Sequence, residues 1–184
     1  RIEVDLESLN QPIVPRSQLD KFPEKGKVAI IWSRLSQSKR LHEALTGFIL
    51  VAQKILDLEL VIIGDGPEMK SLKSHALKST VGDRIHFLGN KNRSYIASAA
   101  RHSDVAIVPY GGSSLVEAAI LQVPIVAFDI EWHSELIRPG ETGYLADYSD
   151  VLHLSDCLKR ALTSRDTTLE MSKNCYSGWN NYRK

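Results

Sequence analysis

The sequence has only two cysteines, no long apolar run and almost no net charge. Cys157 and Cys175 form neither a CxxC pair nor a Cys/His ligand spacing, which argues against a disulfide framework and a structural zinc site. No run approaches the roughly 20 apolar residues that a transmembrane helix needs. The 23 Lys and Arg residues nearly balance the 22 Asp and Glu residues, which argues against nucleic acid as a partner. We therefore expect a cytoplasmic protein from a reducing compartment.

Motifs of several common active sites are also lacking. The six histidines follow no HExxH or other metal-ligand spacing, and no GxSxG motif of a serine hydrolase occurs. We therefore expect scattered histidines that bind no metal. What the chain does have is 43% hydrophobic and 24% charged residues over 184 positions, which is typical of one water-soluble globular domain.

Composition divides the chain into three parts. Residues 1–26 are polar, contain three prolines and begin with Arg rather than Met, so we expect a linker or N-terminal extension of a fragment or processed chain. Residues 27–164 are expected to form the folded domain. Residues 165–184 are polar again, with scattered apolar and aromatic side chains. We expect them to form a C-terminal helical tail that packs on another domain or frays.

Short apolar runs alternate with segments of helical period across residues 27–164, which is typical of βα units in a parallel sheet. Unbroken apolar runs predict strands that are covered on both faces. The sequence therefore predicts an α/β, Rossmann-like parallel sheet with helices on both faces. The candidate strands are 28–32, 60–63, 85–88, 105–108, 124–128 and a shorter sixth near Gly143. The candidate helices are 41–56, 68–78, 94–101, 114–122 and 151–163.

Loops at the carboxyl ends of the strands are the expected ligand sites in such a sheet. The loop after the first strand contains Arg34 and Lys39, which either bind one anion together or are surface charges. The loop after the fourth strand contains Gly111, Gly112, Ser113 and Ser114 directly before a short apolar helix. Glycine lets the backbone approach a ligand, and the free amides at a helix start favour phosphate.

Glu117 has two interpretations. It stands three residues after Ser114, so Ser114 and Glu117 fit a capping box. It lies one helical turn from the glycine loop, so its carboxylate also suits vicinal hydroxyl groups of a ligand. The residues alone favour the capping interpretation.

Three further loops give weaker signals. Gly64 and Gly66 match neither a GxGxxG nor a GxxxxGK[ST] motif, so we expect a simple turn. Gly89 and Asn90 follow the third strand, where backbone groups suit a base edge. Trp132 and His133 follow the fifth strand and are candidate cleft-wall residues.

Taken together and in this order, the segments SRLSQSKR, IIGDGP, IHFLGN, SDVAIVPY, SSLVEAAILQVPIVAFD and SELIRPGETGYLA resemble retaining glycosyltransferases of family 4. The resemblance covers roughly residues 27–146. It implies the C-terminal, donor-binding half of a GT-B enzyme whose acceptor-binding N-terminal half is missing. It also implies transfer of a hexose-type sugar from a nucleoside diphosphate to a glycan or lipid-linked acceptor, in polysaccharide biosynthesis, without a metal or cofactor.

The resemblance assigns roles to individual residues. Arg34 and Lys39 match the positions that bind the donor diphosphate. Glu117 matches the second Glu of an acidic motif and is expected to hold the ribose. Gly111, Gly112, Ser113, Ser114, Gly89 and Asn90 complete the expected substrate-binding set, and no catalytic residue is assigned. The first Glu of the motif has no counterpart, because Pro109 stands eight positions before Glu117 and the loop is about four residues shorter.

Two alternatives to a transferase stay open. The shortened acidic loop is compatible with a non-catalytic nucleotide-sugar-binding module, and a nucleotide-sugar epimerase relative would share the fold. A basic stretch between Glu68 and Arg93 is either a solvated face or an anion-binding surface, which includes peripheral contact with a membrane. The basic residues of this stretch are Lys70, Lys73, Lys78, Arg84, Lys91 and Arg93.

Overall fold

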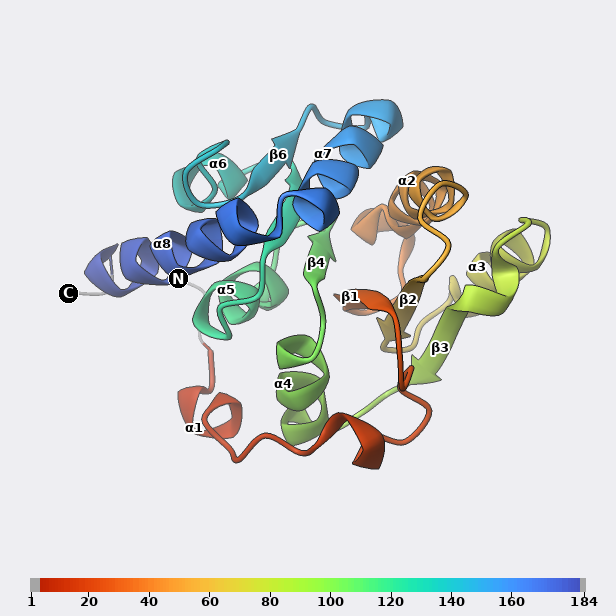
Figure 1. Ribbon diagram of the computed structural model, residues 1–184, viewed down its shortest axis with the longest axis horizontal. Coiled ribbons are helices and arrows are strands. Elements are labelled where there is room, and N and C mark those ends of the chain that lie inside the picture. Colours follow the sequence, from red (N-terminus) through yellow and green to blue (C-terminus); the bar gives the residue numbers. More distant parts are fainter. Residues whose placement is uncertain (1–3, 183–184) are drawn as a thin grey trace.

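A central sheet of six parallel strands organises the computed structural model, which describes residues 4–182 (Figure 1). The expected α/β fold with a Rossmann-like parallel sheet is confirmed, and the six predicted strands are present within two residues of their expected ends. The strands are β1 (Lys27–Trp32), β2 (Leu58–Ile63), β3 (Ile85–Gly89), β4 (Val105–Val108), β5 (Ile125–Phe128) and β6 (Tyr144–Ala146).

The strand order β3-β2-β1-β4-β5-β6 places a change of direction between β1 and β4. These two strands pair directly, with Ala29 opposite Val105. Chain segments that leave their carboxyl ends run to opposite sides, so a crevice opens there. The topology alone therefore points to the loops after β1 and β4 as the place for a ligand.

Helices cover both faces of the sheet (Figure 1). Because successive strand residues point to opposite faces, Ala29 and Ile31 join the core under α2 and α7, whereas Val28 and Ile30 join the core under α4 and α5. Leu72 and Ala76 of α3 also belong to the core under α2 and α7. The helices are α1 (Leu6–Leu9), α2 (Leu41–Ala52), α3 (Met69–Leu77), α4 (Arg93–Arg101), α5 (Ser113–Ile120), α6 (His133–Leu136), α7 (Val151–Thr163) and α8 (Arg165–Tyr182).

Helix α2 ends at Ala52, four residues before the predicted end. The guanidinium of Arg84 donates hydrogen bonds to the carbonyl oxygens of Ala52, Ile55 and Leu58, which binds the carbonyls left free at a helix terminus. Leu56, the last residue of the predicted helix 41–56, is 81% exposed. The apolar period therefore continues past the helix into a turn that a distant arginine holds.

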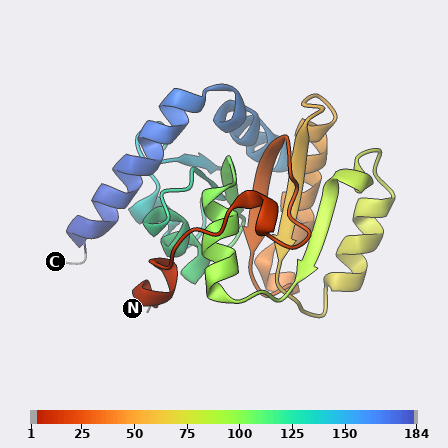
Figure 2. The same ribbon diagram turned by 60° about the horizontal axis from the view of Figure 1, so that its bottom comes forward.

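The segment expected to be a linker or extension is described from residue 4 to residue 26 and packs on the α4 side of the sheet (Figure 2). Leu9 and Phe22 are buried in the core on that side of the sheet. Ser98 of α4 accepts a hydrogen bond from the Val14 amide at 3.0 Å, and Arg101 donates one to the Leu9 carbonyl. The segment is therefore packed onto the domain rather than free of it.

The C-terminal helix α8 packs on the same domain, against α5, α6 and α7. Met171 and Cys175 are buried, and burial raises the pKa of the Cys175 thiol to about 12. The expected C-terminal helix is therefore present over residues 165–182 and packs on this domain. A stripe of small and sulfur-containing side chains, rather than large aliphatic ones, makes this contact, which is why its apolar period is weak in the sequence.

Candidate functional site

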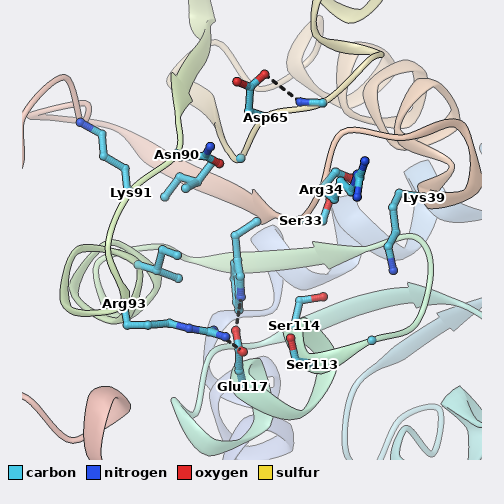
Figure 3. Close-up of a pocket in the computed structure, with 16 residues that line it drawn as sticks. Ser33, Arg34, Lys39, Asp65, Asn90, Lys91, Arg93, Ser113, Ser114 and Glu117 are labelled. Atoms are coloured by element: carbon cyan, nitrogen blue, oxygen red, sulfur yellow. Dashed lines mark hydrogen bonds and ion pairs between the residues drawn. The ribbon is translucent and has the colours of Figure 1, made fainter. Parts of the chain in front are cut away.

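A cavity of about 730 Å³ lies at the carboxyl ends of the strands, at the crevice between β1 and β4 (Figure 3). Loops after β1, β2, β3 and β4 all contribute to it. Its charged lining residues are mostly basic, which favours an anionic ligand. The cavity is lined by Trp32, Ser33, Arg34, Lys39, Ile63, Gly64, Asp65, Gly66, Asn90, Lys91, Arg93, Ile96, Gly112, Ser113, Ser114 and Glu117.

Two cations approach the cavity from the loop after β1. Arg34 is exposed, and its guanidinium has no hydrogen-bond partner within residues 4–182. The Lys39 ammonium donates a hydrogen bond of 2.7 Å to the Gly111 carbonyl and lies 5.1 Å from the centre of the Tyr110 ring. Lys39 therefore bridges the loop after β1 to the loop after β4, and Arg34 is available to an anion.

The start of α5 faces these cations. Gly112 is its N-cap residue, with a φ of 141° that side-chain-bearing residues rarely adopt. A Cβ on Gly112 would lie 3.3 Å from the Lys39 Nζ, so the glycine leaves room beside the ammonium. Ser113 and Ser114 form the first turn, and their hydroxyls have no hydrogen-bond partner among the described residues. Free amides, two hydroxyls and a lysine thus meet at one point.

Glu117 is 1% exposed and is held by two donors (Figure 3). The Trp32 indole Nε1–H donates to Glu117 Oε2 at 2.7 Å, and the Arg93 guanidinium forms an ion pair with Oε1. Because Gly112 rather than Ser114 is the N-cap, the capping-box interpretation is wrong. A buried carboxylate with two fixed donors is instead part of the cavity wall.

The glycines after β2 have a packing role. A Cβ on Gly64, at a φ of 132°, would lie 1.9 Å from the Ser33 carbonyl oxygen, and a Cβ on Gly66 would lie 2.3 Å from that of Leu35. The Leu35 amide also donates to the Asp65 carbonyl at 2.9 Å. These glycines let the loop after β2 lie directly on the loop after β1. This fits the simple turn that the spacing predicts.

Most of the predicted site residues line the cavity together. Gly89 and Gly111 do not line it, although their chain neighbours Asn90 and Gly112 do. Trp132 and His133 are not lining residues either, so they are not cleft-wall residues of this cavity. His133 is fully buried behind Gly111. The predicted residues that line the cavity are Arg34, Lys39, Asn90, Gly112, Ser113, Ser114 and Glu117.

Sequence reasoning missed the role of Arg93, which it placed in a basic stretch. Of that stretch, Arg84 binds carbonyls at the end of α2, Lys91 pairs with Asp20 at 3.0 Å, and Arg93 pairs with Glu117. These three cations are therefore used within the domain. The only available signal for Arg93 was its position shortly after β3, on the cavity edge of the sheet.

Residues 4–182 lack two further features. No group of three or more His, Cys, Asp or Glu side chains gathers as metal ligands do. No helix in this range has the length and apolar character to cross a bilayer.

The family model and similar proteins of known function point to the same family. The family model for glycosyl transferases group 1 matches residues 17–178. A phosphatidyl-myo-inositol mannosyltransferase from Mycobacterium leprae is 33% identical over 150 residues, which cover 77% of this chain and 38% of that protein. An N-acetyl-alpha-D-glucosaminyl L-malate synthase from Bacillus anthracis is 27% identical over 137 residues, covering 72% and 35%. The chain thus spans little more than a third of these relatives' length.

Solved structures share the fold. The C-terminal domain of a glycosyl transferase group 1 family protein, LpcC from Francisella tularensis, matches with a TM-score of 0.82 and 22% identity over 99% of both chains. Anabaena Alr3699/HepE, solved in complex with UDP and glucose, matches with a TM-score of 0.77 and 20% identity over 85% of this chain and 44% of that one.

Proposed function

The chain belongs to the glycosyl transferases group 1, and from this premise we propose that it binds the nucleoside diphosphate sugar donor of a retaining glycosyltransferase. The enzyme would transfer a hexose-type sugar from this donor to a glycan or lipid-linked acceptor, in polysaccharide biosynthesis. We assign donor binding to the cavity described above and to individual residues that line it.

One observation carries the proposal: two cations and the start of α5 converge on a single cavity. A pair of unit charges about 4 Å apart interacts by about 4 kcal/mol at an effective dielectric of 20. Arg34 and Lys39 together therefore have enough charge to hold a diphosphate. The amides of Gly112, Ser113 and Ser114 and the positive end of the helix dipole add donors on the other side.

Glu117 suits the ribose of the same ligand. Trp32 and Arg93 each occupy one of its carboxylate oxygens, yet each oxygen has a second lone pair. Vicinal hydroxyl groups can donate to these remaining acceptor sites. The fixed donors hold the carboxylate in one orientation, which reduces the conformational entropy that the side chain loses on binding.

In the proposed reaction, negative charge develops on the departing diphosphate, beside the cationic groups of the cavity. The bond between the anomeric carbon and the diphosphate oxygen breaks, and a bond from the acceptor oxygen forms on the same face of the sugar. The acceptor proton passes to the departing phosphate oxygen. Arg34, Lys39 and the α5 amides stabilise the negative charge on that leaving group.

The acceptor is expected to be bound outside these residues. The chain spans 38% of the mannosyltransferase and 35% of the malate synthase that it resembles. We propose that an N-terminal GT-B domain supplies the acceptor site and closes on the donor. The 184-residue chain alone should bind donor and catalyse negligible transfer, and turnover by this chain would contradict that.

Calorimetric titration of the chain with UDP, GDP and ADP tests the donor site. We expect at least one nucleoside diphosphate to bind at submillimolar concentration. The corresponding nucleoside without phosphates should bind far more weakly. Absence of binding by all three diphosphates at millimolar concentration would reject the proposed function.

A further inference from the structure

Groups of opposite character approach the turn between β4 and α5. The Lys39 ammonium contacts the Gly111 carbonyl and lies beside Gly112. Two side chains from the loop after β5 also approach Gly111. A Cβ on Gly111 would lie 3.3 Å from Oε2 of Glu131 and 3.0 Å from Nε2 of His133. The turn is therefore bordered by a cation and by two side-chain acceptor atoms.

Glu131 is held in an unusual conformation to reach this position. Its φ is 53°, in the left-handed region that costs a non-glycine residue energy. Its Oε1 accepts a hydrogen bond of 2.6 Å from the Tyr110 hydroxyl, which fixes the carboxylate over the turn. That hydrogen bond also raises the pKa of the Tyr110 hydroxyl. Glu131 is exposed, and its Oε2 has no hydrogen-bond partner among residues 4–182.

His133 adds a second acceptor with no partner. It is fully buried, and its Nδ1 lies 2.7 Å from the Phe128 carbonyl oxygen. A carbonyl only accepts, so Nδ1 carries the proton and Nε2 is left with a lone pair. Nε2 is buried without a hydrogen-bond partner in the described part of the chain. An acceptor in this state favours a neighbouring ligand that donates.

We propose that Glu131, supported by His133 behind the turn, is a specificity-determining residue that accepts hydrogen bonds from hydroxyl groups of the transferred sugar. This inference rests on the proposed function. A cation and acceptor atoms thus border the same turn. A nucleoside diphosphate sugar likewise joins an anionic diphosphate to a ring whose hydroxyl groups donate.

The position of Glu131 also explains how the short turn between β4 and α5 can bind a sugar. The residues from Pro109 to Gly112 contain no acidic side chain. The cavity lining itself offers Asp65 and Glu117, and Glu117 is assigned to the ribose of the ligand. A carboxylate that reaches the turn from the neighbouring strand's loop supplies the acceptor that the turn lacks.

Binding of nucleotide and nucleotide sugar to the same variants tests the proposal. The chain is titrated with UDP, GDP and ADP and with UDP-glucose, UDP-N-acetylglucosamine, GDP-mannose and ADP-glucose. For the nucleotide sugar that binds tightest, Glu131→Gln should weaken binding roughly tenfold, as expected for loss of a charged hydrogen bond. Affinity for the matching diphosphate should change less than twofold. Glu170→Gln, an exposed change on α8 with the same loss of charge, should change neither.

Glu131→Gly guards against a merely structural effect. Glycine adopts the left-handed conformation without strain, so the melting temperature should not fall, while the sugar-specific affinity is lost. Tyr110→Phe, which frees the carboxylate, should give a smaller loss of the same kind. Equal weakening of diphosphate and nucleotide sugar by Glu131→Gln, or no weakening of either, would overturn the proposal.

The two levels of the account fail differently. If the wild-type chain binds none of the diphosphates or nucleotide sugars, both the proposed function and this inference are rejected. If it binds a diphosphate and its nucleotide sugar, and Glu131→Gln leaves their affinities in the same ratio, only the role of Glu131 is rejected.

Discussion

Two glycine-containing loops at the same edge of the sheet have opposite uses. After β2, the backbone of the neighbouring loop occupies the space that a side chain on Gly64 would need. The Ser33 carbonyl oxygen lies 1.9 Å from the position of a Cβ. After β4, Gly111 and Gly112 face only the ends of side chains, those of His133, Glu131 and Lys39. One loop is closed against protein, and the other is bordered by groups that suit a ligand.

The difference teaches how a glycine signal should be interpreted. A glycine packed on backbone is required by the fold, because the backbone cannot move away. A glycine beside the ends of charged side chains is required by whatever those side chains bind. The sequence shows both as glycine turns after a strand, and only the neighbouring loops distinguish them. The substitutions below test this contrast.

Gly64→Ala should produce the largest change. The new methyl group meets a backbone carbonyl and the φ of 132° is unfavourable for alanine, so we expect a loss of roughly 3 kcal/mol or more in the free energy of unfolding. Gly111→Ala, whose methyl group meets side-chain ends, should lose about 1 kcal/mol or less. Urea denaturation of both variants measures the contrast. Equal losses would contradict the distinction between the two loops.

Lys39→Ala should act more on the ligand than on the fold. Removing a charged hydrogen-bond donor beside a phosphate costs about 1.5–3 kcal/mol, which is roughly a 10- to 100-fold loss of diphosphate affinity. Nucleoside affinity should hardly change, and loss of the bond to the Gly111 carbonyl should lower the free energy of unfolding by about 1 kcal/mol. Lys173→Ala on α8 is the control. If nucleoside and diphosphate lose affinity equally, the assignment of Lys39 to the phosphates is wrong.

Trp32→Phe tests whether the strand side of the cavity depends on the hydrogen bond between Trp32 and Glu117. The variant removes the indole donor from the buried Glu117 carboxylate, which should cost about 1–2 kcal/mol in the free energy of unfolding. Trp132→Phe, at a half-buried position that donates no such bond, should cost less. Chemical denaturation at pH 7 compares the two. A Trp32→Phe variant as stable as the wild type would show that Glu117 does not depend on this bond.

The smallest expected effect is a pH dependence at His133. Burial lowers the pKa of this imidazole, an effect that Lys39 reinforces and that the Phe128 carbonyl, Glu131 and Asp129 oppose. As pH falls, His133 therefore gains a proton in the unfolded chain before it does so in the folded chain. The contribution of neutral His133 to the free energy of unfolding is complete above about pH 6.5 and is lost as pH falls toward the lowered pKa.

The matched variant for this effect is His133→Asn, which keeps a donor for the Phe128 carbonyl but does not titrate. Between pH 7 and pH 5.5 the wild type should lose more of its free energy of unfolding than this variant does, as measured by urea denaturation. Identical slopes for the two proteins would show that His133 does not gain a proton on unfolding in this range.

The fold followed from the sequence because the strands are short, mostly apolar runs and this pattern is local, although Glu59 interrupts β2 and His86 interrupts β3. The cavity followed in part, because strand order directs polar loops such as those of Arg34 and Ser114 to one edge. The partners of Glu117 did not follow, since Trp32 and Arg93 approach it from 85 and 24 positions away. Glu131 was missed for the same reason, because its loop meets Gly111 only in the folded chain.

The central claim is that Arg34, Lys39 and the start of α5 hold one diphosphate, and backbone amide NMR of the 184-residue chain tests it most directly. The chain is titrated with the nucleoside diphosphate that binds tightest. We expect the amide signals of Gly112, Ser113 and Ser114 to shift together with those of the loop containing Arg34 and Lys39, with one shared dissociation constant. Saturable binding that shifts signals elsewhere, while these amides stay unchanged, would contradict the account.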